Sequence, residues 1–260
     1  MAIGPSPVFL DSLADAAAAA ILPLFRTRLA IEDKGKAGFD PVTLADRAAE
    51  AAMRKLIGED YPAHGIVGEE YGPEKEDAEF VWVLDPIDGT RSFITGLPLW
   101  GVLIGLLHKG VPVLGMMAQP FTGERFAGDG TEAWLTRNGG RHPLATRTCA
   151  EISAAALLTT SPNIFAAGDR EAYQRVEGSV RLARYGTDCY GYCMVAAGHA
   201  DLVVEAGLQP YDIVALIPII EGAGGRVSNW DGGSAAAGGR VVASGDARLH
   251  DIVLERLARG

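Results

Sequence analysis

The segment that most constrains this chain is an apolar strand that ends in two closely spaced aspartates. Residues 80–84, Phe-Val-Trp-Val-Leu, have the composition of a buried strand, and the motif Asp-Pro-Ile-Asp-Gly-Thr follows at 85–90. Pro86 imposes an extended turn, so the carboxylates of Asp85 and Asp88 converge on one point. The strand end therefore predicts a small site built from acidic side chains.

The same turn offers groups for a cation and an anion side by side. The Ile87 carbonyl lies between the two aspartates, and oxygen donors gathered in this way suit a hard divalent cation. Gly89 and Thr90 follow at a predicted helix start, where backbone N–H groups and the helix dipole favour an anion. We therefore expect a cation site next to a phosphate-binding turn.

Further acidic residues fit the same purpose. Glu69 follows the short apolar run 66–67, Asp212 stands in the first turn of a predicted helix, and Asp46 is a candidate from a helix near the N-terminus. Carboxylates crowded in one pocket repel one another and a phosphate ester, so only bound cations make the arrangement favourable. The formal net charge of −10 is thus an argument for metal.

Taken singly, each piece has an ordinary explanation. Asp-Pro is a common turn initiator, Gly-Thr is a common helix entry, and a Glu-Glu pair usually lies on a solvated surface. The functional interpretation depends on finding all of them in one chain.

Apolar spacing predicts where the helices lie. A first helix is expected over 8–30, interrupted by Pro23. Thr43, with Asp46 three residues later, predicts a capping box that opens a second helix over 44–57, ended by Gly58. Later helices are expected at 169–177, 189–197, 212–222 and 249–257.

Short apolar runs bounded by glycines and acids predict the strands, with a hairpin at Lys109-Gly110 and a turn at 138–140. Strands are expected at 66–67, 80–84, 102–107, 111–117, 125–127, 133–135, 155–159, 181–185, 202–205 and 241–244. They occur in mixed groups, which favours a layered α/β fold over a TIM barrel. We expect one domain over 1–260, with halves of roughly 1–145 and 146–260 and the metal site between them.

Charge and cysteine content disfavour several classes of protein. Lys and Arg are scattered singly or in pairs, so neither nucleic acid nor an anionic membrane is an expected partner. The apolar stretch 16–25 is too short to span a bilayer and lacks the basic start of a signal peptide. Three cysteines predict a reducing, cytoplasmic compartment, with Cys189 and Cys193 in the core. The histidines match no metal motif and are expected at the surface or in loops: His64, His108, His142, His199 and His250.

The chain resembles the inositol monophosphatase family of magnesium-dependent, lithium-sensitive phosphatases from about Phe39 to Val227. The motifs that carry the resemblance stand in the family order, as Gly68-Glu69-Glu70, 85–90, and Tyr211-Asp212 with Gly224-Gly225. The segment 40–46 matches the family's Asp-x-Val-Thr-x-x-Asp, and Lys34 or Lys36 matches a basic residue before it. The resemblance implies a homodimer and the αβαβα fold, a layered α+β sandwich, of inositol monophosphatases and fructose-1,6-bisphosphatases.

The resemblance also implies a role for each motif residue. Two or three Mg²⁺ ions, with Mn²⁺ as an alternative, would be held by Glu69, Asp85, the Ile87 carbonyl, Asp88 and Asp212. The catalytic residues that position and activate the attacking water would be Glu69, Thr90 and Asp46. The substrate would contact Asp88, Gly89, Thr90, Arg91, Asp188, Glu205 and Asp212. The implied reaction is hydrolysis of a phosphomonoester by in-line displacement, without a covalent phosphoenzyme.

Departures from the inositol-type pattern resemble the histidinol-phosphatase branch, which removes phosphate from L-histidinol phosphate in histidine biosynthesis. They are Tyr211 before the last aspartate, the segment 91–93, and an acid at Asp188. Asp188 and Glu205 would add negative charge beside the leaving alcohol, where histidinol carries an ammonium group and inositol is neutral.

Alternatives stay open at this point. Asp188 would also be explained as the cap of the helix that starts at Cys189. The substrate would otherwise be inositol 1-phosphate or a broader range of sugar phosphates. From another class, the chain would be a non-catalytic regulatory binding protein, although such a protein has no need to keep so costly a charge cluster.

Overall fold

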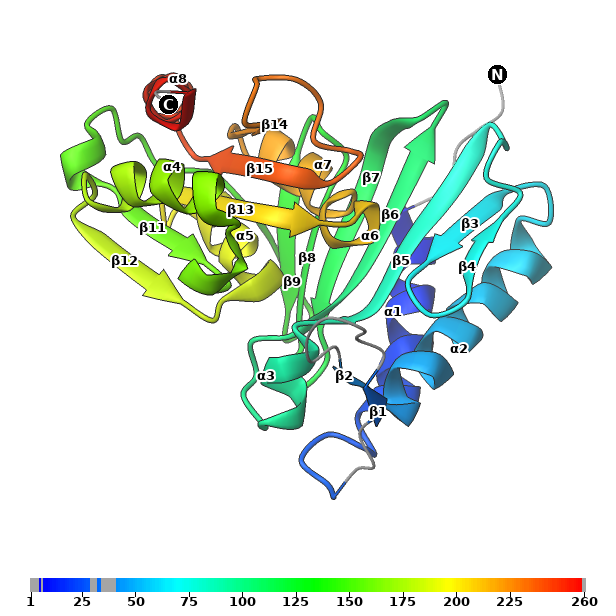
Figure 1. The fold of residues 1–260 in the computed structure, drawn as a ribbon. Helices are drawn as coiled ribbons and strands as arrows, with labels where there is room; N and C mark the ends of the chain where they lie inside the picture. The colour runs from blue at the N-terminus through cyan, green and yellow to red at the C-terminus, as the bar shows by residue number, and fades with distance from the viewer. Residues whose placement is uncertain (1–4, 6, 29–31, 34–40, 259–260) are drawn as a thin grey trace.

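Sheets and helices alternate in layers in the computed structural model, which describes residues 5, 7–28, 32–33 and 41–258 (Figure 1). The order is a helix pair, an eight-stranded sheet, central helices, a five-stranded sheet and an outer helix pair. This is the αβαβα layered α/β fold that the resemblance implied. Lys34, Lys36, Phe39 and Asp40 lie outside the described residues.

The large sheet supplies the strand that leads into the acidic turn. Its strands, in spatial order, are β10 (Gly140–Pro143), β9 (Ala133–Arg137), β8 (Glu124–Gly128), β7 (Val111–Gln119), β6 (Gly101–His108), β5 (Phe80–Asp88), β3 (Gly65–Gly68) and β4 (Gly72–Glu74). β3 runs parallel to β5, and the other neighbouring pairs are antiparallel. Helices cover both faces, so β5 is a nearly continuous apolar run rather than an alternating one.

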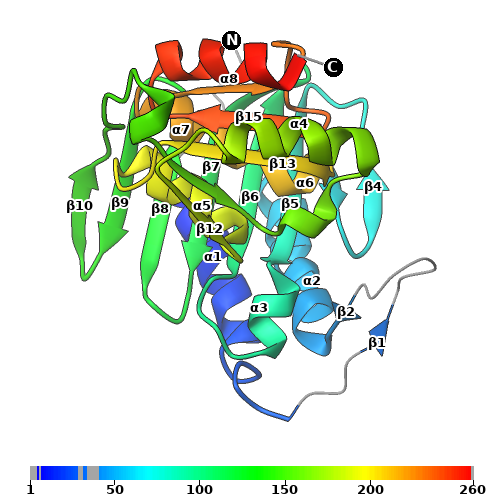
Figure 2. The ribbon, with the colours of Figure 1, turned by 60° about the vertical axis from the view of Figure 1, so that its left-hand side comes forward.

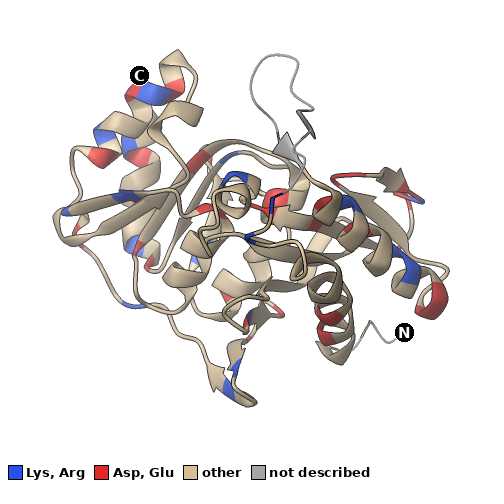
Figure 3. Cartoon of the chain, turned by 90° about the horizontal axis from the view of Figure 1, so that it is seen from below, with Lys and Arg blue, Asp and Glu red and all other residues tan. Residues whose placement is uncertain are grey.

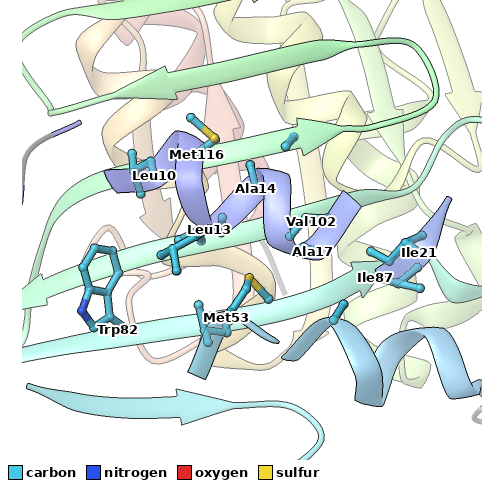
Figure 4. Close-up of a cluster of buried hydrophobic side chains, with 14 of the residues drawn as sticks. Leu10, Leu13, Ala14, Ala17, Ile21, Met53, Trp82, Ile87, Val102 and Met116 are labelled. Atoms are coloured by element: carbon cyan, nitrogen blue, oxygen red, sulfur yellow. The ribbon is translucent and has the colours of Figure 1, made fainter. Parts of the chain in front are cut away.

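Two helices cover the outer face of the large sheet, α1 (Pro7–Ile21) and α2 (Leu44–Asp60). The buried residues of α1 recur at helical spacing and form one stripe toward the sheet, as Figure 4 shows: Leu10, Leu13, Ala14, Ala17 and Ile21. Met53 of α2 and Trp82 of β5 belong to the same cluster. This core supports β5 from behind and leaves its end free to build a site.

The small sheet has the strand order β12 (Leu182–Tyr185), β11 (Ala156–Thr159), β13 (Leu202–Leu208), β15 (Gly239–Ser244) and β14 (Arg226–Asn229). The central layer between the two sheets contains α5 (Asp188–Ala196), α6 (Pro210–Ile213) and α7 (Leu216–Gly222). The outer face is covered by α4 (Ala167–Glu177) and α8 (Ala247–Ala258), which lie side by side in Figure 2. Short elements complete the chain: β1 (Glu32–Asp33), β2 (Pro41–Val42), α3 (Thr90–Ile94), η1 (Ile152–Ala154) and η2 (Pro162–Ile164).

Several element predictions are confirmed, and others need correction. Thr43 and Asp46 form the predicted capping box. The first helix ends at Ile21, just before the Pro23 that was expected to interrupt it, instead of continuing to residue 30. Gly58 does not end α2, which continues to Asp60 and is capped at Tyr61, the residue before Pro62.

The predicted helix over 212–222 is two short helices, α6 and α7, and the strands β4, β10 and β14 were not predicted. Those strands have few apolar residues, because each lies at the edge of its sheet. Cys189 and Cys193 are free and buried in the central layer, as predicted. Figure 3 shows Lys and Arg scattered over many elements. In the described part of the chain, every helix is too short or too polar to cross a membrane.

The expectation that all histidines lie at the surface or in loops is wrong for His250. It is fully buried on α8, with its ring nitrogens 2.8 Å from the hydroxyl oxygens of Ser228 and Ser244. The Ser228 hydroxyl also donates to the Asn229 carbonyl at 2.7 Å, so the histidine ring lies in a hydrogen-bonded pocket between two serines. Burial lowers the pKa of His250 to about 4.

This burial predicts a pH dependence of stability. The unfolded histidine gains its proton near its ordinary pKa of 6.5, whereas the folded one does so only near 4. The free energy of unfolding should therefore fall by up to about 3 kcal/mol as the pH drops through that window. Urea unfolding of the wild type and of His250→Asn, compared between pH 7 and pH 4, measures this. Parallel pH profiles for the two proteins would contradict it.

Candidate active site

The acidic turn at the end of β5 is fastened by its own first aspartate. Asp85 is buried, and its Oδ1 accepts the N–H of Ile87 at 3.0 Å. The pairing with β6 shifts register between Asp85 and Asp88, so the chain bulges here. The turn is thus built by a strand irregularity that aims Asp88 toward the second half of the protein.

Gly89 and Thr90 lie where the sequence predicts a helix start. Gly89 has a φ of +81°, and a Cβ there would stand 3.2 Å from the side chain of Asp188. Thr90 begins α3, and its hydroxyl donates to the Ile87 carbonyl at 3.0 Å. Glycine is therefore required both by the backbone conformation and by the close approach of Asp188.

Asp212 joins the turn from a distant part of the sequence. It stands in α6, where its Oδ2 accepts the N–H of Gln209 at 2.6 Å in a capping box. One carboxylate oxygen from each of Asp85, Asp88 and Asp212 lies within 4.8 Å of the other two. Three of the predicted metal-ligating residues are thus brought together.

The electrostatics of this triad fit a divalent cation. Burial, reinforced by neighbouring carboxylates, raises the pKa of Asp85 and of Asp88 well above the usual range. Burial raises the pKa of Asp212 to about 6. Ionised together, these groups need positive charge between them, and an all-oxygen donor set suits Mg²⁺ or Mn²⁺. The adjacent Cys189 thiol is no competitor, because burial raises its pKa and keeps it neutral.

Glu69 approaches the triad from the turn after β3. Its N–H donates to the Leu84 carbonyl at 3.2 Å, and its side chain shares a hydrogen bond with Asp85. Asp46 is placed differently, because its Oδ2 accepts both the N–H and the hydroxyl of Thr43, at 2.9 and 2.6 Å. Among the described residues, the lining of the acidic cleft includes Glu69 and excludes Asp46. A catalytic role for Asp46 therefore stays a prediction.

Two adjoining hollows surround the triad. A cleft of about 320 Å³ is lined by the turn 87–91 and Glu69. A cavity of about 190 Å³ is lined in part by Glu205. They share as lining residues Asp88, Thr160, Asp188, Gly207 and Asp212. The predicted metal and substrate residues thus meet in one continuous depression.

Asp188, on α5, faces the acidic turn at the end of β5. Its Oδ2 accepts the Ser92 hydroxyl at 3.1 Å. The N–H of Cys189, at the start of α5, instead donates to Asp88 at 2.7 Å. Capping of α5 therefore falls to Asp88, and the capping explanation of Asp188 is not supported. Burial raises the pKa of Asp188, opposed by hydrogen bonds from Ser92 and Thr160 and by the charge of Arg91.

Glu205 lies deeper, on β13. It is 3% exposed, and its Oε1 accepts the N–H and the hydroxyl of Thr160 at 2.7 and 2.8 Å. Burial raises its pKa to about 7. The strand bulges between Glu205 and Leu208, which turns Gly207 into the cleft.

Thr160 and Tyr192 are polar residues of this cavity that sequence reasoning missed. Thr160 lies just past the end of β11 and lines both hollows. Tyr192 is 2% exposed, and its hydroxyl has no hydrogen-bond partner among the described residues. The spacing of Tyr192 four residues after Asp188 on one helix was the available signal.

The sequence model of the inositol monophosphatase family matches residues 8–259. The chloroplastic bifunctional phosphatase IMPL2 of Arabidopsis thaliana is 45% identical over 263 residues, covering 95% of this chain and 73% of that protein. A histidinol-phosphatase of Mycobacterium tuberculosis is 38% identical over 229 residues, covering 86% of this chain and 87% of that protein. An inositol monophosphatase structure from Zymomonas mobilis has a TM-score of 0.85 at 40% identity, covering 97% of this chain and 99% of that one.

Fold and sequence agree on one class of protein, a phosphatase with an acidic cleft. The chain belongs to the inositol monophosphatase family. That family is metal-dependent, and the carboxylate triad provides suitable ligands here.

Neutralising one member of the triad should separate metal binding from folding. We expect Asp88→Asn to raise the melting temperature of the metal-free protein, because repulsion falls while an amide oxygen still accepts from Cys189. The further rise caused by Mg²⁺ should be lost, and turnover should drop by about 100-fold or more. Differential scanning calorimetry with and without Mg²⁺ measures the first two effects. Asp129→Asn, a change in an exposed turn aspartate, is the control. A variant that keeps the Mg²⁺ response would contradict the assignment.

Proposed function

We propose that this protein is a Mg²⁺-dependent histidinol-phosphate phosphatase, which hydrolyses L-histidinol phosphate to L-histidinol and phosphate in histidine biosynthesis. The observation that carries the proposal is the position of Asp188. Its carboxylate lies in the wall shared by the acidic cleft and the cavity that contains Glu205. A substrate whose phosphate lies in the cleft would place its ammonium group against these two acids.

The chain's own residues would divide the work as follows. Glu69, Asp85, Asp88, Asp212 and the Ile87 carbonyl would hold the cations. The N–H groups of Gly89 and Thr90 would orient the phosphate, with Arg91 at the rim of the cleft. Glu69 and Thr90 would hold the attacking water, and Asp188 and Glu205 would bind the leaving alcohol. When bound, Mg²⁺ would supply Lewis-acid polarisation of the phosphate and a more acidic water.

The bond that breaks joins phosphorus to the ester oxygen, and the bond that forms joins phosphorus to the water oxygen. The water loses a proton and the leaving alkoxide gains one, so the products are alcohol and inorganic phosphate. Hydrogen bonding to Glu69 and Thr90 would fix the water on the side opposite the leaving group.

A second candidate is an inositol-1-phosphatase or a broader sugar phosphatase. The names of the relatives support both substrates, since they include a histidinol-phosphatase and an inositol monophosphatase at similar identity. Asp188 favours the first candidate, because a neutral polyol gains nothing from a second acid beside the leaving oxygen. A non-catalytic binding role is disfavoured by the carboxylate triad.

Assembly and location are also proposals. We infer a homodimer from the family resemblance, and a cytoplasmic location from the cysteine content. The Arabidopsis relative is named chloroplastic, so location differs within the family if this inference holds.

Removing the charge of Asp188 should lower kcat/KM for L-histidinol phosphate by about 100-fold, because only that substrate offers a positive charge to pair. For inositol 1-phosphate the change should be small. Asn keeps an oxygen that accepts from Ser92, so Asp188→Asn preserves the local hydrogen bond. Initial rates of both proteins on the two esters provide the measurement.

Ser92→Ala is the matched control. It removes the hydrogen bond that Asp188→Asn preserves, and it leaves the charge of Asp188 in place. Equal losses on both esters in Asp188→Asn would mean that the charge does not select the substrate. Faster wild-type hydrolysis of inositol 1-phosphate would favour the second candidate.

Cation preference follows from the oxygen donors. We expect turnover with Mg²⁺ and with Mn²⁺, and little turnover with Ca²⁺, whose larger and more variable coordination misplaces the reacting groups. Steady-state rates with each chloride salt, together with melting temperatures that report binding, check this. Comparable turnover with Ca²⁺ and Mg²⁺ would contradict the expected preference for the smaller cation.

A further inference from the structure

We propose that Glu50 is a positioning residue for the metal site: its carboxylate fixes the turn 69–72, so that Glu69 is held beside Asp85 before a cation binds. The inference rests on the proposed role of Glu69 as a metal ligand. Glu50 does not line the acidic cleft, and no motif in the sequence indicates it.

Glu50 is fully buried on α2, and its partners account for that burial. Oε2 accepts the N–H of Glu70 at 2.7 Å, and Oε1 accepts the N–H of Tyr71 at 3.2 Å. Arg54, one helical turn further along, donates its Nε–H to Oε1 at 2.7 Å. A buried carboxylate with a guanidinium and two amide donors is both neutralised and well anchored.

The clamp extends to both ends of the turn. Arg54 also donates to the Gly72 carbonyl, where β4 begins. At the other end, Gly68 packs directly on Glu50, since an added Cβ would lie 2.0 Å from Oε1. Glu50 and Arg54 together therefore hold the whole connection between β3 and β4.

The held backbone determines where Glu69 points. Its own N–H donates to the Leu84 carbonyl, next to Asp85, and Glu50 holds the two N–H groups that follow. The N–H groups of Glu69, Glu70 and Tyr71 thus all have fixed acceptors, so the backbone is held on both sides of the Glu69 side chain. Without the clamp, the turn would lose the two hydrogen bonds that place Glu69 beside Asp85, and the cation would then have to order the turn.

Glu50→Gln tests this with the full-length protein. The glutamine amide keeps one oxygen that can accept a hydrogen bond and replaces the other with an NH₂ group, which cannot accept from the donor it faces. The clamp is therefore weakened with little change in side-chain volume. We expect the Mg²⁺ dissociation constant from isothermal titration calorimetry to rise about tenfold, while kcat at saturating Mg²⁺ stays within about threefold. In the metal-free protein, hydrogen exchange should accelerate at the amides of Glu70 and Tyr71.

Gly68→Ala reaches the same contact from the other side, by displacing the Glu50 carboxylate. It should weaken Mg²⁺ binding by a similar factor, and it carries the test if Glu50→Gln is too unstable to purify. The double variant should bind Mg²⁺ no more weakly than the weaker-binding single variant, because both substitutions disrupt the same interaction. Additive losses would overturn the inference, since Gly68→Ala would then act on Glu69 directly.

Asp201→Asn is the matched control. Asp201 is also a buried carboxylate that binds an arginine and a backbone N–H, those of Arg147 and Ala156, but it lies outside the cleft. It should lower the melting temperature and leave Mg²⁺ affinity unchanged. An equal loss of Mg²⁺ affinity in this control, or unchanged Mg²⁺ affinity in Glu50→Gln, would overturn the role of Glu50 but not the proposed metal site. A wild type that binds no Mg²⁺ would overturn the proposed metal site as well.

Discussion

The close approach of Asp85, Asp88 and Asp212 is the constraint that the surrounding fold has to meet. Each of these carboxyl groups has a raised pKa because folding removes water from it, and neighbouring acids raise the pKa of Asp85 and Asp88 further. Such an arrangement opposes folding, so the surrounding fold has to hold it in place. The core between α1, α2 and the large sheet packs against β5 and supports the turn at its end.

The two halves of the chain meet at this site through hydrogen bonds that the acids themselves accept. Asp88 accepts from the first N–H of α5, and Asp188 accepts from Ser92 of α3. Each of these two hydrogen bonds joins a segment before residue 95 to a segment after residue 185. The acidic turn and α5 are therefore positioned relative to each other by the same carboxylates that the proposed chemistry would use.

Hydrogen bonds from neighbouring residues organise the site. Thr90 donates to the Ile87 carbonyl, Thr160 donates to Glu205, and Glu50 holds the turn that follows Glu69. These partners orient side chains that would otherwise repel one another. Under the proposed function, a change at a single residue such as Asp188 would alter substrate preference while the hydrogen bonds around the acidic turn are kept.

The sequence alone determined the local chemistry: the turn 85–90, the capping box of Thr43 and Asp46, the buried strands, and the family with its layered fold. The turn, the capping box and the strands depend on neighbours in the chain, so spacing reveals them. The family and its αβαβα fold followed from the resemblance of the motifs. The sequence did not reveal the burial of His250 or the clamp of Glu50 on the turn after β3. Only the tertiary structure decided these, because each depends on side chains that meet across layers, and the distances between layers are set by packing rather than by sequence order.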